Sequence, residues 1–365
     1  MRVLQVVGCM NMGGLETFVM NIFRNIDRTK VQFDFLYITN EKCFYDDEIL
    51  ELGGRIFRIT GKSKNLIKHC HELKAFIEDN KDIDIVHIHS VSALCLLDAF
   101  IIKKCGINNI VVHSHASLAP HKALNEICKV ILPWYSKKMI ACSDKAAAWM
   151  FPKWKKDIEI LPNGIDVTKY AYNDELSIIN KKQLGIEGNF VVGHVGRMSP
   201  VKNHSFLLNI FAEIKKKKNN SVLLLIGDGQ LKESLINQAL HLGISESVLF
   251  LGIREDINTL LQTMDAFVFP SLREGLPLSV VEAQAAGVRC FISDTITRDV
   301  VITDIVQQIS LNNGEEYWAN TILRTCKEDE LHKDTSEEIK AAGFDIKETT
   351  NKLITIYEMM IRDSQ

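Results

Sequence analysis

Short apolar runs, many of them β-branched, recur along this chain with helical stretches between several of them. Seven runs lie in the first half, at residues 3–8, 31–39, 55–59, 83–89, 110–115, 139–143 and 158–161. Five lie in the second half, at residues 190–195, 222–226, 248–251, 266–269 and 290–293. Such alternation predicts parallel strands covered by helices. The absence of short repeats and low-complexity tracts excludes solenoids and disordered arms.

The alternation is interrupted once, after Pro162-Asn163-Gly164-Ile165-Asp166, and then restarts. A chain of 365 residues is too long for one ordinary domain and suits two of roughly 150 to 180 residues. We predict an α/β fold of two Rossmann-like, doubly wound domains facing across a cleft, with boundaries at 1–168 and 169–345. Residues 346–365 contain a periodic helix that could pack on either domain, and we expect it on the N-terminal one.

Composition excludes several classes of function. The net charge of −3 shows no excess of basic residues of the kind found in nucleic-acid-binding proteins, so we expect no nucleic-acid partner. The nine cysteines are odd in number and contain no C-x-x-C, which indicates neither a disulfide framework nor a zinc site. The first apolar run is too short for a signal peptide, and no run reaches membrane-spanning length. We therefore expect a protein of the reducing cytoplasm.

Ligands of open α/β sheets bind at the carboxyl ends of the strands. The stretch FVFPSLREGLPLSVVEAQAAG, residues 267–287, runs from a strand through a loop with Glu274 into a helix. Pro277 suits the first turn of that helix, and Gly287 suits its end. The unpaired N–H groups of a helix start suit a phosphate. We therefore expect an anion beside residues 275–278.

A second carboxylate, Glu282, lies about 7 Å further along the predicted helix. Glu274 and Glu282 could then accept hydrogen bonds from groups on the two sides of a diphosphate. A random pair of glutamates would more often be a loop acid and a solvated helix acid.

Glycines and bases follow other strands. Gly13 and Gly14 open the first helix, where backbone could approach an anion or simply form a tight turn. Their spacing is not G-x-G-x-x-G, which disfavours a dinucleotide. Arg197 and Lys202, in GRMSPVKNH, could converge on one diphosphate, although either base alone would more often be solvated. The loops GDG, with Gly227, and GIREDI are weaker signals for backbone binding of a nucleotide base.

Four segments, in this order, resemble the retaining nucleotide-sugar glycosyltransferases of the GT-B fold, family 4 or group 1. They are GRMSPVKNH, LLLIGDGQL, LGIREDI and FVFPSLREGLPLSVVEAQAAG. The E-x7-E pattern matches at Glu274 and Glu282, and MGGLE, VHIHS and NGID match at residues 12–16, 86–90 and 163–166. The resemblance thus covers nearly the whole chain and is strongest to bacterial exopolysaccharide and capsule enzymes. It implies an N-terminal acceptor domain and a C-terminal donor domain.

The resemblance implies a role for each donor-side residue. Arg197 and Lys202 would bind the diphosphate, Glu274 the hydroxyls of the donor sugar, and Glu282 the ribose. The remaining donor-side residues, which would act largely through backbone, are Gly13, Gly14, Gly227, Ile253, Arg254, Gly275, Leu276, Pro277 and Leu278. We count Arg197, Lys202 and Glu274 as catalytic as well as donor-binding.

Histidines supply the remaining candidates. The family has a catalytic histidine after a strand, near the anomeric carbon, for which His113 and His115 are both available and His115 is favoured. A lone histidine is more often structural, so this assignment depends on the resemblance. His87 and His89, at the end of another strand, are expected on the acceptor side.

The implied reaction is sugar transfer with retention at the anomeric carbon. The departing nucleoside diphosphate develops negative charge, which fixed cations and helix-end amides stabilise. We expect a nucleotide sugar, with uridine as base, as co-substrate, and neither a cofactor nor a metal. The acceptor would be a saccharide or a polyprenyl-diphosphate-linked glycan at the inner face of the membrane. Two faces could meet anionic lipid, or be ordinary solvated helix surface: Lys62, Lys64, Leu66, Ile67 and Lys68, and Trp134, Tyr135, Lys137 and Lys138.

Two other classes of function remain open. One is a different enzyme on the same scaffold, such as a UDP-sugar 2-epimerase or a sugar phosphorylase, although we identify no pyridoxal-phosphate lysine for the latter. The other is a protein that binds nucleotide sugars without catalysis. An epimerase would convert the donor with no acceptor present, and a binding protein would show no turnover with any acceptor.

Overall fold

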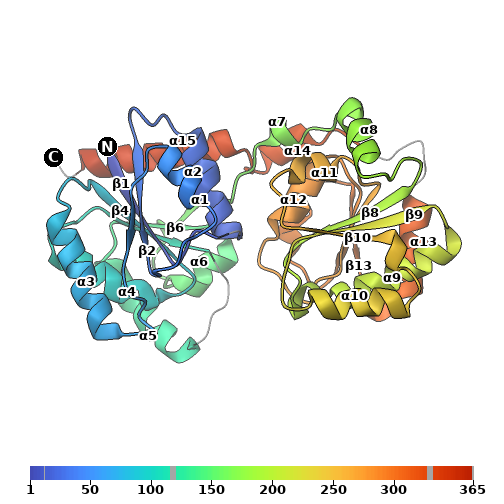
Figure 1. Cartoon of the computed structure of the whole chain (residues 1–365). Coiled ribbons are helices and arrows are strands. Elements are labelled where there is room, and N and C mark those ends of the chain that lie inside the picture. Colours follow the sequence, from blue (N-terminus) through green and yellow to red (C-terminus); the bar gives the residue numbers. More distant parts are fainter. Residues whose placement is uncertain (12, 116–120, 327–331, 364–365) are drawn as a thin grey trace. The chain divides into compact units, whose positions relative to one another are not determined.

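The computed structural model describes residues 1–11, 13–115, 121–326 and 332–363. The chain divides into two compact units, and each is described by itself (Figure 1). Unit 1 comprises Met1–Ile165 with Gly343–Gln365, and unit 2 comprises Asp166–Ala342.

Unit 1 is built on a seven-stranded parallel sheet. Its strands are β1 Arg2–Val7, β2 Gln32–Tyr37, β3 Ile56–Arg58, β4 Ile85–Ser90, β5 Ile110–Ser114, β6 Lys138–Ala141 and β7 Glu159–Ile160. Its helices are α1 Gly14–Asn25, α2 Asp46–Glu51, α3 Leu66–Asp79, α4 Leu96–Lys104, α5 Lys122–Ile131, α6 Asp144–Met150 and α15 Ile346–Arg362, with 3-10 turns η1 Ala93–Cys95 and η2 Leu132–Trp134. The strand order β3-β2-β1-β4-β5-β6-β7 reverses direction between β1 and β4. This reversal is the switch point at which ligands of doubly wound sheets bind.

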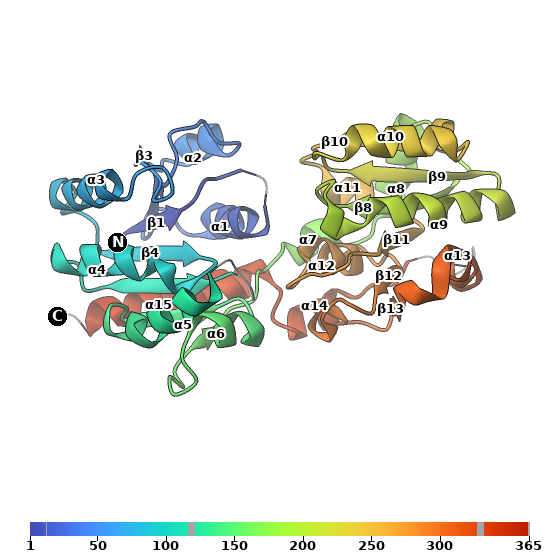
Figure 2. The ribbon, with the colours of Figure 1, turned by 90° about the horizontal axis from the view of Figure 1, so that it is seen from below.

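Unit 2 repeats this arrangement with six parallel strands. They are β8 Phe190–Val195, β9 Ser221–Ile226, β10 Val248–Gly252, β11 Ala266–Phe269, β12 Cys290–Ser293 and β13 Val306–Ile309. The helices are α7 Val167–Tyr170, α8 Asp174–Gln183, α9 His204–Lys217, α10 Lys232–His241, α11 Ile257–Leu261, α12 Leu278–Ala285, α13 Gly314–Thr325 and α14 Ser336–Ala341, with 3-10 turns η3 Pro200–Lys202, η4 Ser245–Ser247, η5 Arg298–Val300 and η6 Leu311–Asn313. The order β10-β9-β8-β11-β12-β13 reverses between β8 and β11. Figure 2 shows α9 and α10 running beside the β8 and β9 strands.

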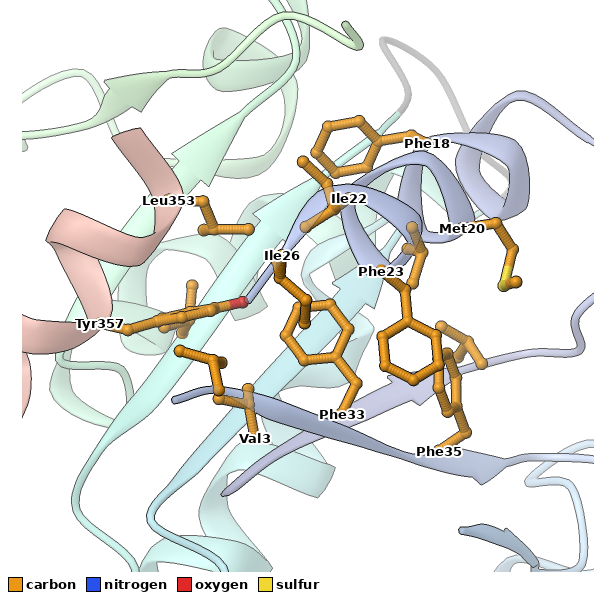
Figure 3. Packing of buried hydrophobic residues seen from close by; sticks show 14 of the residues in the cluster. Val3, Phe18, Met20, Ile22, Phe23, Ile26, Phe33, Phe35, Leu353 and Tyr357 are labelled. Atoms are coloured by element: carbon orange, nitrogen blue, oxygen red, sulfur yellow. The ribbon is translucent and has the colours of Figure 1, made fainter. Parts of the chain in front are cut away.

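The C-terminal helix α15 belongs to the core of unit 1. Its buried residues recur at helical spacing, and Leu353 and Tyr357 join an aromatic cluster with Phe23, Phe33 and Phe35 (Figure 3). Gly164 permits this packing, because a Cβ there would lie 2.9 Å from the Cα of Ile346.

Two details add to what the sequence predicts. The compact units divide at Ile165 and Ala342, three residues from the expected boundaries at 168 and 345, and Ile165 exchanges backbone hydrogen bonds with Phe344 and Ile346 of the returning chain. Strand β13 was not expected, because its sequence VQQI carries two glutamines and offers no apolar run.

Candidate functional site

The two strands at the switch point of unit 2 are followed by loops that are bonded to each other. The Leu272 amide donates to the Val201 carbonyl at 2.8 Å, and the Asn203 side-chain amide donates to the Pro270 carbonyl at 3.1 Å. Asn203 adopts a left-handed φ of 57°, which turns the chain from η3 into α9. The loop after β8 and the loop after β11 therefore form one surface at the carboxyl end of the sheet.

This surface carries three of the charged residues that the sequence singled out. Lys202 Nζ lies 2.9 Å from Glu274 Oε1, and both side chains are mostly buried. The same ammonium lies 4.5 Å above the ring centre of Phe269 at the end of β11. Arg197 is exposed, and no ion-pair partner is recorded for it within the described residues. An incoming anion would thus meet a free guanidinium and would compete with Glu274 for the Lys202 ammonium.

Helix α12 begins directly after this loop. Pro277 precedes the helix as its N-cap, one position earlier than expected, and no side chain caps the helix start. The Val280 amide donates to the Pro277 carbonyl at 3.1 Å, and the Leu278 and Ser279 N–H groups remain available to an anion. Gly287, with φ of 70°, follows the end of the helix as the sequence predicts. A Cβ at Gly275 would touch nothing within 4 Å, so the space beside the helix start is open.

Glu282, one turn into α12, already has a partner. The Tyr170 hydroxyl donates to Glu282 Oε1 at 2.9 Å. Burial raises the pKa of Glu282, and the Tyr170 hydrogen bond and Lys169 oppose this rise. Tyr170 lies in α7, more than a hundred residues earlier, and no motif marks it. A ribose at Glu282 would share or replace this hydroxyl.

The loops after β8, β9 and β10 pack closely through glycines. Gly227 has φ of 131°, and a Cβ there would lie 2.3 Å from the Gly196 carbonyl oxygen. Its amide donates to the Gly252 carbonyl at 2.8 Å. Position 227 therefore requires glycine, both because of its positive φ and because a Cβ would clash with the Gly196 carbonyl.

The predicted base-gripping loop lies beyond Gly252. Ile253 is exposed, and Arg254 forms a two-fold ion pair with Asp256 at 2.6 and 2.8 Å, which raises the pKa of Arg254. The described contacts join neither Ile253 nor Arg254 to Lys202 or Glu274.

Unit 1 carries a second group of candidates at its own switch point. Gly13 is the N-cap of α1 with extended backbone, and the helix start has no side-chain cap. A Cβ at Gly14 would touch nothing, whereas a Cβ at Gly13 would lie 2.3 Å from Glu16 Oε2, so the space is open at Gly14 and the Glu16 carboxylate lies beside Gly13. One turn later the Phe18 ring packs 5.7 Å from the His115 ring, which ties this helix start to the end of β5. Met12, the first residue of MGGLE, lies outside the described residues.

The histidines separate into buried and accessible ones. His115 follows β5 and is partly exposed, and burial of its ring lowers its pKa to about 3, so it is neutral at physiological pH. His113 is fully buried, and its ring nitrogens have no partner in the described structure. His87 is also fully buried, and its Nδ1 lies 2.6 Å from the Tyr357 hydroxyl. The expectation that His87 lines the acceptor side is therefore wrong, because β4 points it into the core against α15.

His89 supports His115 instead of facing outward. The Gln5 Oε1 atom lies 2.7 Å from His89 Nε2, and His89 Nδ1 lies 2.9 Å from His115 Nε2. A carbonyl oxygen only accepts, so His89 carries its proton on Nε2 and its Nδ1 accepts from His115. His115 Nδ1 is then left with a lone pair, and this atom is buried without a hydrogen-bond partner among the described residues. No motif marks Gln5, a polar residue in the middle of the apolar strand β1.

The imidazole cluster is poorly arranged for a metal ion. The ligand nitrogens of His87, His89 and His113 lie within 4.8 Å of one another, but the rings stack, with centroids 4.1 Å apart for His87 and His89. A tetrahedral zinc ion needs converging nitrogens about 3.3 Å apart. The acidic D-x-D spacing at Asp82 and Asp84 lies before β4, at the opposite end of that strand, where Asp82 pairs with the Arg55 guanidinium and Asp84 accepts from the Arg2 backbone amide. We assign neither group to a metal.

Comparison with known proteins follows the division into units. Residues 12–169 match the family described as Glycosyltransferase Family 4, and residues 177–342 match the family described as Glycosyl transferases group 1. A Bacillus subtilis protein named as a glycosyltransferase, EpsF, is 35% identical over 98% of this chain and 96% of its own length. An Escherichia coli UDP-Gal:α-D-GlcNAc-diphosphoundecaprenol α-1,3-galactosyltransferase is 29% identical over 90% of each chain. The Staphylococcus aureus capsular polysaccharide biosynthesis glycosyltransferase CapH is 26% identical over 98% of each.

Solved structures share the fold. Anabaena HepE, in complex with UDP and glucose, superposes with a TM-score of 0.79 and 19% identity over 98% of this chain and 100% of its own. A glycosyltransferase from Rickettsia africae gives a TM-score of 0.80 and 15% identity over 99% and 98%. The expected fold class, two parallel-sheet Rossmann-like domains of the GT-B type, is confirmed.

Proposed function

This chain belongs to the glycosyltransferases, and from that premise we propose that it is a retaining, metal-independent hexosyltransferase of exopolysaccharide or capsule biosynthesis. The donor is a UDP-sugar carrying a hexose or an N-acetylhexosamine, and the acceptor is a glycan or a polyprenyl-diphosphate-linked saccharide. The relatives support both classes of substrate by name, since one uses UDP-galactose with a lipid diphosphate acceptor and another makes capsule.

The observation that carries the proposal is the cation pair at the uncapped start of α12. Lys202 is held 2.9 Å from Glu274, Arg197 is unpaired among the described residues, and the helix amides lack a cap. As the sugar bond breaks, charge grows on the departing diphosphate, and these donors stabilise that charge once Lys202 has exchanged Glu274 for the diphosphate. Glu274, released from Lys202, can accept from sugar hydroxyls.

The remaining roles follow from position. Glu282 accepts from the ribose, and Gly227 with the Ile253–Arg254 loop borders the base. Within unit 1, Gly13, Gly14 and neutral His115 face the reacting sugar, with His89 behind His115. No cofactor is required, because the nucleotide leaves with its own electron pair. The enzyme works in the cytoplasm, where its nine free cysteines stay reduced.

Transfer from labelled UDP-sugars to an undecaprenyl-diphosphate-linked sugar tests the proposal. Arg197→Ala, Lys202→Ala and Glu274→Ala should each lower kcat/KM about 10²-fold. Lys216→Ala is the matched control, because that lysine pairs with Glu213 at the end of α9 that is far from η3 and Lys202. Wild-type rates in any one of the three would remove that residue from the site.

The same assay separates the alternatives. Activity should survive EDTA, and a full loss that Mg²⁺ or Mn²⁺ restores would contradict metal independence. Conversion of the UDP-sugar without acceptor would identify an epimerase instead. Binding without turnover across a panel of acceptors would identify a non-catalytic binding protein.

A further inference from the structure

Helix α5 buries polar side chains and exposes apolar ones, the reverse of an ordinary surface helix. Its polar Asn125 is fully buried, accepting from the Ala93 amide at 2.8 Å and donating to the Trp149 carbonyl at 3.1 Å. Lys129 is mostly buried and donates to the Ala148 carbonyl. The apolar residues Leu124, Ile127, Val130 and Ile131 instead face outward. The helix is therefore anchored by polar contacts and presents its apolar stripe to the outside.

Two tryptophans extend this apolar stripe. Trp134, one turn beyond α5, and Trp154 are 59% and 56% exposed, and their ring centres lie 6.0 Å apart. We call Leu124, Ile127, Val130, Ile131, Trp134 and Trp154 the α5 patch. Scattered exposed apolar residues are ordinary, but a contiguous apolar surface of this kind marks an interaction site.

The surroundings of the α5 patch are basic. Residues 121–157 contain eight lysines and three carboxylates, in a chain whose net charge is −3. Lys153 and Lys156, on either side of Trp154, are exposed, and the described residues supply no ion-pair partner for them. Lys103 of α4 donates to the Trp134 carbonyl. Apolar and cationic groups are thus concentrated on one part of unit 1.

We propose that the α5 patch docks unit 1 onto an anionic lipid bilayer. Aliphatic side chains of α5 would enter the membrane interface, the tryptophans would sit at headgroup level, and the lysines would bind acidic headgroups. A second copy of this chain fits less well, because two lysine-rich faces would repel each other. Among the described residues, no helix is long and apolar enough to cross a bilayer.

The docking surface differs from the two faces expected from sequence. Lys62 and Lys138 are engaged by Asp98 and Glu159, and Lys137 donates to the Met360 carbonyl. Leu66 and Ile67 of α3 are exposed, but no aromatic residue extends them as Trp134 and Trp154 extend α5. Of the expected residues, only Trp134 belongs to the α5 patch.

Vesicle co-sedimentation of the full chain, without donor or acceptor, tests the proposal. Wild type should bind vesicles of phosphatidylglycerol and phosphatidylcholine in equal parts at least tenfold better than pure phosphatidylcholine. Ile127→Ser with Trp154→Ser should lower this binding at least tenfold, and Lys153→Gln with Lys156→Gln should weaken both binding and its salt dependence. Ile178→Ser on α8 of unit 2, where Ile178 is 64% exposed against 61% for Ile127, is the control and should bind like wild type.

Three results would overturn the docking surface. The first is a wild-type protein that does not bind anionic vesicles, and the second is a set of patch variants that bind them as the wild type does. The third is a wild-type dimer, measured by light scattering, that Ile127→Ser converts to a monomer. Membrane docking and sugar transfer are tested separately, because transfer to a water-soluble acceptor analogue should be unchanged in the patch variants. The same melting temperature in all variants shows that folding is retained.

Discussion

At the scale of single residues, Gln5 determines which nitrogen of His115 is free. Its side-chain oxygen fixes the proton of His89 on Nε2, and His115 Nδ1 is left as an acceptor. Gln5→Glu keeps the shape and adds a buried negative charge, which should raise the pKa of the coupled imidazoles above the value of about 3 at His115. We expect the acid limb of the kcat/KM profile to move to higher pH.

Tyr357→Phe is the matched control for this prediction. It removes the hydroxyl that bonds to His87 Nδ1 and that also interacts with the Gln5 side chain, but it leaves the Gln5–His89 and His89–His115 contacts in place. Its pH profile should therefore coincide with that of the wild type. If Gln5→Glu lowered the rate equally at every pH, Gln5 would have a structural role only.

The sequence identified those site residues that follow a strand and carry a charge. Arg197, Lys202 and Glu274 stand in loops whose places are set by β8 and β11, so their meeting could be anticipated. Tyr170 could not be, because its contact with Glu282 depends on how α7 packs against α12. His87 was placed wrongly because an HIHS run does not reveal that α15 returns to cover that strand.

At the scale of elements, Gly164 decides whether α15 can close the core of unit 1. An alanine Cβ there would lie 2.7 Å from Thr349 Oγ1 and 2.9 Å from the Ile346 Cα. Backbone cannot move aside as a flexible side chain can, so Gly164→Ala should destabilise unit 1 by about 1 to 3 kcal/mol. Urea denaturation measures the loss.

Gly8→Ala is the control, because a Cβ at Gly8 meets nothing within 4 Å and its φ is not positive. We expect it to stay within about 0.5 kcal/mol of the wild type. An equal loss in both variants would mean that α15 does not depend on the close approach at Gly164.

Elements with a strong apolar pattern were predictable, and those held by tertiary contacts were not. Strands β8, β11 and β12 have the bounds that their apolar runs predict, whereas β13 pairs with β12 despite its two glutamines. Helix α5 shows the converse: its apolar period predicts a helix but not the side that faces the core. Asn125 decides that side through two buried hydrogen bonds.

At the scale of the whole molecule, buried histidines couple folding to pH. Burial lowers the pKa of seven histidines, four in unit 1 and three in unit 2: His87, His89, His113, His115, His194, His204 and His332. The unfolded chain binds protons near pH 6.5, while the folded values are about 3 for His115 and about 4 for His204 and His332. The unfolded state therefore holds more protons between these limits, and stability falls as pH falls from about 6.5 toward 4.

Each fully neutral histidine contributes up to about 1.4 kcal/mol per pH unit to this loss. Burial also raises the pKa of Glu282 and Asp265, so these two carboxyl groups favour the folded state as the pH falls. Two carboxyl groups do not offset the loss from seven histidines. The melting temperature should thus fall steeply below pH 6 and be nearly flat between about pH 7 and 8. At higher pH it should fall again, because burial raises the pKa of Cys95, Cys290 and Cys326 while the thiols of the unfolded chain ionise.

His113→Leu isolates one histidine in this linkage. Neither ring nitrogen of His113 has a partner within the described residues, so leucine removes a titrating group without breaking a hydrogen bond. At pH 8 the variant should be as stable as the wild type, and below pH 6 its unfolding free energy should fall less steeply, by about one proton. Parallel curves for the two proteins, measured by urea denaturation from pH 8 to 5, would show that His113 is not titrated on unfolding, and the acid sensitivity would then belong to the other histidines.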